Sequence, residues 1–233
     1  MTYQFTPEDA AALRGKTISP AVPLVLPVPT HQTVFKAAFD RVFACVALLC
    51  LSPILLVVGV LVAVTSKGPI LFEHARVGKG GVSFRCYKFR TMVPDAEARL
   101  EKALKADPKL RKEWEENRKL ARDPRITPIG RILRKTSLDE LPQFWNVLRG
   151  DMSIVGPRPI VEAELEKYGP HASHYLSVRP GITGAWQTNG RSDVSYPERV
   201  AMDVDYVRTM SLWGDIKIVF KTVRVVLAQA GAH

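Results

Sequence analysis

An uncharged stretch limits the folds open to this chain more than any other feature does. Residues Val42–Val64 hold no charged side chain over 23 positions. As a straight helix this stretch would be ~35 Å long, enough to cross a hydrocarbon core of ~30 Å. Pro53 interrupts it near the centre, because proline lacks a backbone donor and clashes with the preceding turn, while the Ser52 hydroxyl can bond to the freed carbonyls. The stretch therefore predicts a membrane segment with a break at Ser52-Pro53.

Cations flank both ends of the stretch: Lys36 and Arg41 precede it, and Lys67, Arg76 and Lys79 follow it. Because lysine and arginine favour the cytoplasmic side, both ends are predicted to stay there. A re-entrant helical hairpin over residues 33–67 satisfies both ends. A kinked ordinary span is the open alternative, and a buried helix of a soluble domain is less favoured.

The overall composition indicates a folded chain with an anionic partner. The 233 residues are 46% hydrophobic, which excludes a disordered chain, and the net charge is +10. Nucleic acid, an anionic membrane surface and a phosphorylated substrate all fit that charge. The three cysteines show neither CxxC spacing nor an even framework, which indicates reduced thiols and a cytoplasmic location.

The two ends of the chain differ in character. Residues 1–32 are proline-rich and predict an extended, disordered tail, and Glu8 and Asp9 stand where a secretion signal would carry cations. Residues 211–230 predict a basic amphipathic helix, which either lies in the headgroup plane of a membrane or packs on the core of its own domain. Its apolar positions are Leu212, Trp213, Ile216, Val219, Phe220, Val223, Val226 and Leu227, and its cations are Lys217, Lys221 and Arg224.

The remaining segments predict an α+β fold that is mainly helical, with a short sheet. Residues 82–92 alternate with the period of a strand, and the GKGG sequence at 78–81 predicts a hairpin turn before it. Residues 95–121 predict a solvated helix pair with a break at Asp107-Pro108. These segments belong to one domain, 68–233, beyond the membrane segment.

Two adjacent carboxylates, Asp139 and Glu140, stand out in the basic sequence TSLDELPQ at 136–143. Either Ser137 and Glu140 form a capping box, or Asp139 is itself the cap and Pro142 falls in the first turn. Both arrangements predict a helix start at this pair. Exposed N–H groups there, together with Arg131 and Arg134, favour an anion.

Arginines on constrained loops indicate phosphate chemistry. Arg158 lies between Pro157 and Pro159, which hold it in an extended loop suited to a bidentate phosphate contact. Arg179 and Arg191 lie on glycine-containing turns. Each of these arginines alone is more typical of a solvated surface. Their combination with the carboxylate pair and a membrane segment favours a functional site that binds phosphate. His171 and His174 could share a helix face, although no further metal ligands cluster near them.

Three other classes of protein were compared with these features, and one of them stays open. A glycosidase needs two carboxyl groups facing each other across a sugar, whereas neighbouring helix residues point about 100° apart. A nucleic-acid partner is not expected, because aromatic residues are not interleaved with the cations. A non-catalytic, membrane-tethered basic scaffold, in which the carboxylate pair only caps a helix, stays open.

The chain resembles the monotopic phosphoglycosyl transferases, also called bacterial sugar transferases, from about Lys36 to Leu227. Five motifs in one order carry the resemblance: the Ser52-Pro53 break, YKFRTM at 87–92, LRKTSLDELPQ at 133–143, GDMSIVGPRP at 150–159 and RPGITGAWQTNGR at 179–191. It is most similar to the short members that prime exopolysaccharide synthesis.

The resemblance implies transfer of a hexose-1-phosphate from a UDP-sugar to undecaprenyl phosphate, with membrane lipids as a further partner, at the cytoplasmic face of the bacterial inner membrane. Asp139 would attack the β-phosphorus and release UMP, leaving a covalent phospho-sugar, and Asp139 with Glu140 would hold Mg²⁺. The implied substrate-binding residues are Arg134 for the lipid phosphate, Lys88, Arg90, Arg158, Arg179 and Arg191 for the nucleotide and transferred phosphate, and Gln187 in the last motif.

One departure from the family pattern concerns the donor sugar. The chain reads Ala185-Trp186-Gln187-Thr188, where many members have Trp-Ala-Gln or Leu-Trp-Gln followed by Val or Ile. If this loop contacts the donor, the sugar preference differs from that of close relatives. The short exopolysaccharide type favours galactose or glucose, and the oligomeric state cannot be predicted.

Overall fold

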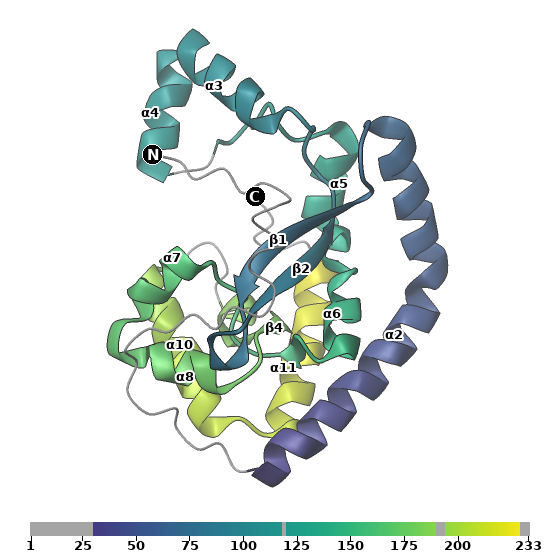
Figure 1. Cartoon of the computed structure of the whole chain (residues 1–233), viewed down its shortest axis with the longest axis vertical. Coiled ribbons are helices and arrows are strands. Elements are labelled where there is room, and N and C mark those ends of the chain that lie inside the picture. The colour runs from purple at the N-terminus through teal and green to yellow at the C-terminus, as the bar shows by residue number, and fades with distance from the viewer. Residues whose placement is uncertain (1–29, 118–119, 190–193, 229–233) are drawn as a thin grey trace.

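The computed structural model describes residues 30–117, 120–189 and 194–228, and consists of helices arranged around two small sheets (Figure 1). The helices are α2 Thr30–Thr65, α3 Ala96–Ala106, α4 Pro108–Asn117, α5 Pro128–Thr136, α6 Gln143–Arg149, α7 Glu162–Leu165, α8 Ala172–Ser177, α9 Ala185–Thr188, α10 Tyr196–Thr209 and α11 Leu212–Leu227. The strands are β1 Leu71–Val77, β2 Ser83–Phe89, β3 Ser153–Val155 and β4 Gly181–Thr183, and the 3₁₀ turns are η1 Lys79–Gly81, η2 Leu138–Glu140 and η3 Glu166–His171. The predicted mainly helical α+β fold is confirmed, whereas the predicted tail lies outside the described residues except for its last three positions.

Helix α2 is one continuous, curved helix along one side of the molecule, with Pro53 inside it (Figure 1). Pro53 cannot donate to the carbonyl four residues earlier, and the Ser52 hydroxyl donates to that carbonyl, Leu49 O, at 2.8 Å. The helix therefore continues through Ser52-Pro53, where the sequence predicted two arms separated by a break. The chain does not fold back at this position, so the structure has no helical hairpin here. The side of the membrane on which each end of the helix lies stays a prediction.

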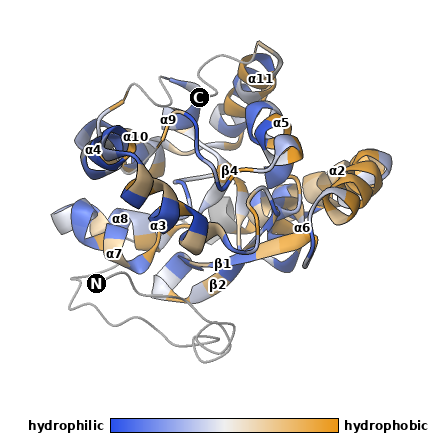
Figure 2. Ribbon diagram, turned by 90° about the horizontal axis from the view of Figure 1, so that it is seen from above, coloured by the Kyte–Doolittle hydropathy of each residue, from blue (hydrophilic) through white to orange (hydrophobic). Residues whose placement is uncertain are grey.

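Helix α2 packs against the domain along one face only, and most of its surface is exposed. Residues Val34–Thr65 are apolar and long enough to cross a membrane, and only 11% of their most apolar window is buried. Asp40, Ala44, Val58 and Val62 face the domain and are buried, whereas the opposite face exposes large apolar side chains. In Figure 2 the helix forms a mostly hydrophobic ridge at the edge of the molecule. This exposure does not fit the buried helix of a soluble domain.

Strands β1 and β2 form the predicted hairpin. They pair antiparallel, with His74 opposite Cys86 and Phe72 opposite Lys88, and η1 makes the turn between them. The predicted helix pair is also confirmed, because α3 ends at Ala106 and α4 begins at Pro108.

The two glycine-containing motifs pack backbone against backbone. Strand β3 pairs parallel with β4, with Ser153 opposite Gly181. A Cβ atom on Gly181 would lie 2.1 Å from the backbone nitrogen of Gly156, well inside van der Waals contact. Glycine is therefore required at Gly181 by the close approach of the two segments, not by turn geometry.

Helix α11 packs one face on the core of the domain and exposes another apolar face. Its inner face carries the buried Asp215, with Ile218 and Val219 packed against the core. Its outer face exposes Trp213 at 66% and Phe220 at 73%. The predicted amphipathic helix is confirmed, and it has an unpartnered apolar face in addition to a packed one.

A buried tyrosine–aspartate pair makes the stability of the domain depend on pH. The Tyr168 hydroxyl donates to Asp203 Oδ2 at 2.7 Å, and burial raises the pKa of Asp203 to about 6. Between pH ~4 and ~6 an unfolded Asp203 loses its proton while the folded one keeps it, so the free energy of unfolding falls as pH rises, by up to about 3 kcal/mol.

We expect Asp203→Asn to remove this part of the decline in the free energy of unfolding. Urea denaturation at pH 4 and pH 7 measures this decline, with the exposed Asp205→Asn variant as the control. If the unfolding free energy falls by the same amount between these pH values in Asp203→Asn and in the parent, the assignment is contradicted.

Candidate active site

The carboxylate pair lies in a 3₁₀ turn between two helices and caps neither of them. Ser137 adopts the left-handed conformation (φ 57°) that ends α5, and η2 follows at once. Neither η2 nor α6 has a side-chain cap, so both predicted capping roles are wrong. The physical reason is the reversal at Ser137, which turns the chain so that Asp139 becomes 92% buried instead of standing free at a helix end.

The turn brings the pair against strand β2 and the chain that follows it. Lys88 Nζ lies 2.6 Å from Glu140 Oε1, although the two residues are 52 positions apart in the sequence. Arg134, at the end of α5, donates from Nε to Thr91 Oγ1 at 2.8 Å. Four of the predicted site residues are thus brought together.

The charges around Asp139 show how an acidic pair is accommodated in a basic chain. Burial, followed by the charge of Glu140, raises the pKa of Asp139 to about 6, while the charges of Lys88 and Arg134 act in the opposite direction. The two cations thus offset part of the cost of holding a buried carboxylate beside another one. The result is a carboxylate that is ionised at neutral pH and lies within a cationic surrounding.

Close packing fixes the position of Arg134 relative to Thr91. The Thr127 amide donates to Thr91 O at 3.0 Å, and a Cβ on Gly130 would lie 2.1 Å from the same oxygen. Any larger residue at Gly130 would therefore push α5 away from the chain that follows β2.

Asn146 is a positioning residue that the sequence analysis did not identify. It is fully buried in α6, its Oδ1 accepts from Tyr87 N at 3.0 Å, and its Nδ2 donates to Arg85 O at 2.6 Å. These two bonds hold α6 to the strand that carries Lys88. An asparagine in a helix gives no such signal in the sequence, because its partners lie about 60 positions away.

The donor set at the pair fits a magnesium ion that is completed by substrate. Mg²⁺ in phosphate-processing sites binds one or two carboxylates, several waters and phosphate oxygens. Asp139 and Glu140 supply two carboxylates, and no group of three or more metal-binding side chains occurs among the described residues. The mutual repulsion of these two carboxylates is what a dication relieves.

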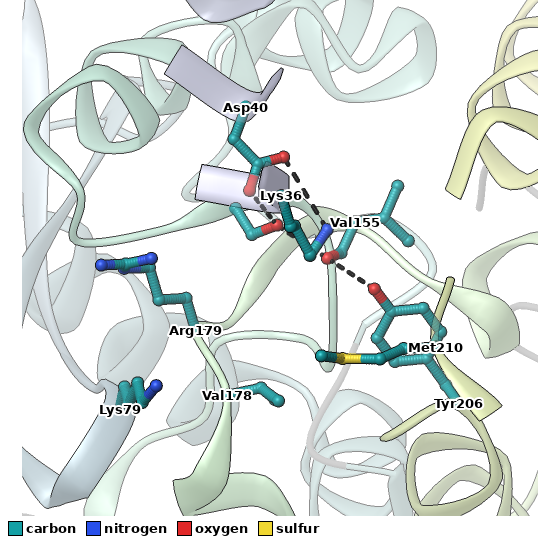
Figure 3. Close-up of a pocket in the computed structure, with 9 residues that line it drawn as sticks. Lys36, Asp40, Lys79, Val155, Val178, Arg179, Tyr206 and Met210 are labelled. Atoms are coloured by element: carbon teal, nitrogen blue, oxygen red, sulfur yellow. Dashed lines mark hydrogen bonds and ion pairs between the residues drawn. The ribbon is translucent and has the colours of Figure 1, made fainter. Parts of the chain in front are cut away.

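Two predicted phosphate ligands are occupied elsewhere. Arg90 is buried and donates to the carbonyls of Ser66 and Pro69, so it holds the chain where α2 ends. Arg179 donates from Nε to Gly150 O at 2.7 Å. It lines a small cavity of about 30 Å³ below the start of α2, with Lys79, Asp40 and Tyr206 (Figure 3). Neither member of the carboxylate pair lines that cavity.

The remaining predicted residues have other partners or lie outside the described part. Arg158 is exposed, with Cζ 5.8 Å from the centre of the Trp186 ring. Gln187 Nε2 donates to Ile182 O at 3.1 Å. Arg191 lies outside the described residues. His174 Nε2 accepts from Arg208 Nε at 3.2 Å, which gives His171 and His174 no feature of a metal site in the described part.

Comparison with known proteins identifies the family. The model of the bacterial sugar transferase family matches residues 31–229. A UDP-galactose-lipid carrier transferase of Erwinia amylovora is 51% identical over 204 residues, 87% of this chain and 43% of that protein. The exopolysaccharide production protein ExoY of Rhizobium meliloti is 45% identical over 226 residues, 95% of this chain and 100% of that protein. The UDP-glucose:undecaprenyl-phosphate glucose-1-phosphate transferase of Escherichia coli is 42% identical over 213 residues, 88% of this chain and 43% of that protein.

The chain thus spans less than half the length of two of these relatives and the full length of the third. The match covers the carboxylate pair, its cations, α11 and all of α2 but its first residue. The family predicted from the five motifs, and with it the transferase class of enzyme, is confirmed. The chain belongs to the bacterial sugar transferase family.

Proposed function

We propose that this protein transfers hexose-1-phosphate, with galactose or glucose as the favoured sugar, from a UDP-sugar to undecaprenyl phosphate, as the first step of exopolysaccharide repeat-unit assembly. One observation carries the proposal: a buried carboxylate, Asp139, next to a second carboxylate and between two cations. The printed names of the relatives, which include a galactose-lipid carrier transferase and a glucose-1-phosphate transferase, support the donor and acceptor classes.

In the proposed reaction an oxygen of Asp139 attacks the β-phosphorus of the donor. The bond to the bridging oxygen breaks and UMP leaves, so that a covalent aspartyl phospho-sugar remains. A phosphate oxygen of the lipid then attacks the same phosphorus and the carboxylate is restored. Lys88 and Arg134 lower the repulsion between Asp139 and the incoming diphosphate, and they keep the carboxylate ionised.

Asp139 and Glu140 would hold Mg²⁺. A bound divalent cation would neutralise charge on the diphosphate that the two cations leave uncompensated. Lys88 keeps Glu140 in place at 2.6 Å, so the second carboxylate is oriented before any substrate arrives.

The proposed location is the cytoplasmic face of the bacterial inner membrane. The exposed apolar faces of α2 and α11 support this location, because a lipid phosphate lies at headgroup depth while its chain stays in the hydrocarbon. We expect single cysteines placed before Lys36 and after Lys67, in a variant without native cysteines, to be labelled from the same side of sealed vesicles. Labelling from opposite sides would establish a span and overturn the re-entrant topology.

The reaction is tested with purified protein, Mg²⁺, undecaprenyl phosphate and a set of UDP-sugars. Release of UMP with UDP-galactose or UDP-glucose is the expected result, and the preferred donor identifies the sugar. The alternative, a non-catalytic membrane scaffold, predicts no UMP with any donor.

A further inference from the structure

A buried arginine that the reaction above does not use lies at the start of α10. Arg199 is only 8% exposed. Its Cζ lies 4.9 Å from the centre of the Trp186 ring and 5.0 Å from that of Tyr196. Two aromatic contacts thus fix the plane of the guanidinium group.

One edge of this guanidinium has no partner within the described part of the chain. Nε and Nη2 of Arg199 are both buried and make no hydrogen bond there. These two nitrogens carry parallel N–H groups, the arrangement that binds two oxygens at once. A buried charged donor without a partner is costly, so an unfilled edge of this kind indicates a ligand.

The nearest candidate partner on the same helix is already engaged. Asp203, one turn further along α10, accepts the hydrogen bond of the Tyr168 hydroxyl at 2.7 Å. No ion pair between Asp203 and Arg199 occurs among the described contacts. The indole Nε1 of Trp186, beside Arg199, is also buried and unpartnered within the described residues. Two neighbouring side chains thus hold three buried N–H donors without an acceptor within the described residues.

Charges beside this place and in the carboxylate pair both act on Cys86 of β2. Arg158 lies over Trp186 at 5.8 Å, and its charge acts on both Arg76 and Cys86. The charges of Lys88 and Glu140 act on the same Cys86. Arg158, beside Trp186, and Glu140, in the carboxylate pair, are thus both close enough to Cys86 to shift its pKa.

We propose that the Nε/Nη2 edge of Arg199 binds a pair of oxygens on the UDP-hexose donor, remote from the phosphorus that Asp139 attacks. This inference rests on the proposed function. Two parts of the donor offer such a pair: the phosphate of the UMP half and two adjacent hydroxyls of the hexose. Arg199 contacts Trp186, in the segment 185–188 that departs from the family pattern, and the proposal places both residues in the donor site.

Arg199→Lys tests the proposal, because lysine keeps the charge and the aromatic contact but loses the two-donor edge. We expect the KM for the UDP-hexose to rise about 10- to 100-fold, with a smaller change in kcat and an unchanged melting temperature. The control is Lys167→Met, since Lys167 is an exposed cation 4.9 Å from the centre of the same Tyr196 ring. This control is expected to keep the parental KM.

Inhibition by UMP separates the two parts of the donor. If Arg199→Lys weakens inhibition by UMP as much as it raises KM, the edge binds phosphate; if UMP inhibits as before while KM rises, the edge binds the hexose.

A parental KM in Arg199→Lys overturns the proposal, as does a fall in melting temperature without a change in KM, which would indicate a partner within the chain. Should the parent release no UMP, calorimetric titration with the UDP-hexose decides: binding weakened by Arg199→Lys supports this inference although the proposed reaction has failed, and equal binding or none overturns it.

Discussion

Asp139→Asn is expected to lower UMP release from the preferred UDP-sugar by at least about 10³-fold. An amide oxygen is a poor nucleophile towards phosphorus, and the remaining groups can bind the donor but cannot form the covalent intermediate. The fold is expected to survive, because asparagine fills nearly the same volume and removes a buried charge next to Glu140. UMP release and membrane association are measured on the same preparation.

Three variants make this result specific to the nucleophile. Asp95→Asn changes an exposed carboxylate on the surface and is expected to keep full activity. Glu140→Gln should reduce the rate but still allow a phospho-sugar adduct on Asp139, because the nucleophile is intact. Lys88→Met should lower the rate as well, since it leaves Glu140 without its partner at 2.6 Å. Parental activity in Asp139→Asn, or no adduct detected by mass spectrometry on trapped parent protein, would exclude the covalent mechanism.

The parts of the fold that local patterns determine could be predicted from the sequence. Strand β2, the turn before it and the break before Pro108 depend on alternation, glycine and proline within about ten residues, and all were confirmed. The amphipathic α11 was also predicted. Its periodicity could not show, however, that one apolar face packs on the core while the next one stays exposed.

The sequence motifs identified residues of the site but not the partners that these residues contact. Lys88 and Glu140 were both implied as site residues, one for the donor and one for the metal, but their contact at 2.6 Å was not predicted. Arg90 belongs to the same motif as Lys88 but turns to the carbonyls of Ser66 and Pro69, because residues two apart on a strand can have different neighbours beyond its end. The left-handed Ser137 gave no signal, since glycine or asparagine is usual in that conformation.

A buried charge cluster, invisible in the sequence, joins the start of α2 to the start of α11. Lys36 Nζ lies 2.5 Å from Asp215 Oδ2 and 3.8 Å from Asp40 Oδ1, and these carboxylates are only 1% and 3% exposed as residues. The Tyr206 hydroxyl donates to Asp215 at 2.8 Å, and the Ser153 hydroxyl donates to Asp40 at 2.7 Å. One lysine therefore forms ion pairs with two buried carboxylates. The cluster fixes the relative orientation of the two helices that carry the exposed apolar faces.

Removing this lysine is expected to cost about 3–5 kcal/mol of unfolding free energy, because Lys36→Met leaves two buried carboxylates without a cation. Lys105→Met is a matched control: Lys105 Nζ lies 2.6 Å from Glu101 Oε1, nearly the same distance, but both side chains are more than 60% exposed. That control should change the stability by less than about 1 kcal/mol. Denaturant titrations in detergent, followed by circular dichroism, measure both variants.

Adding Asp215→Asn to Lys36→Met separates the uncompensated charge from the loss of packing. The double variant is expected to recover part of the lost stability, since the neutral asparagine can still accept the hydrogen bond from Tyr206, which Asp215 now accepts at 2.8 Å. A recovery in stability together with weaker membrane association would indicate that the cation orients α2 against α11 as well as stabilising the fold. If Lys36→Met unfolds at the parental denaturant concentration, the two carboxylates are not dependent on Lys36, and the cluster cannot be what orients the helices.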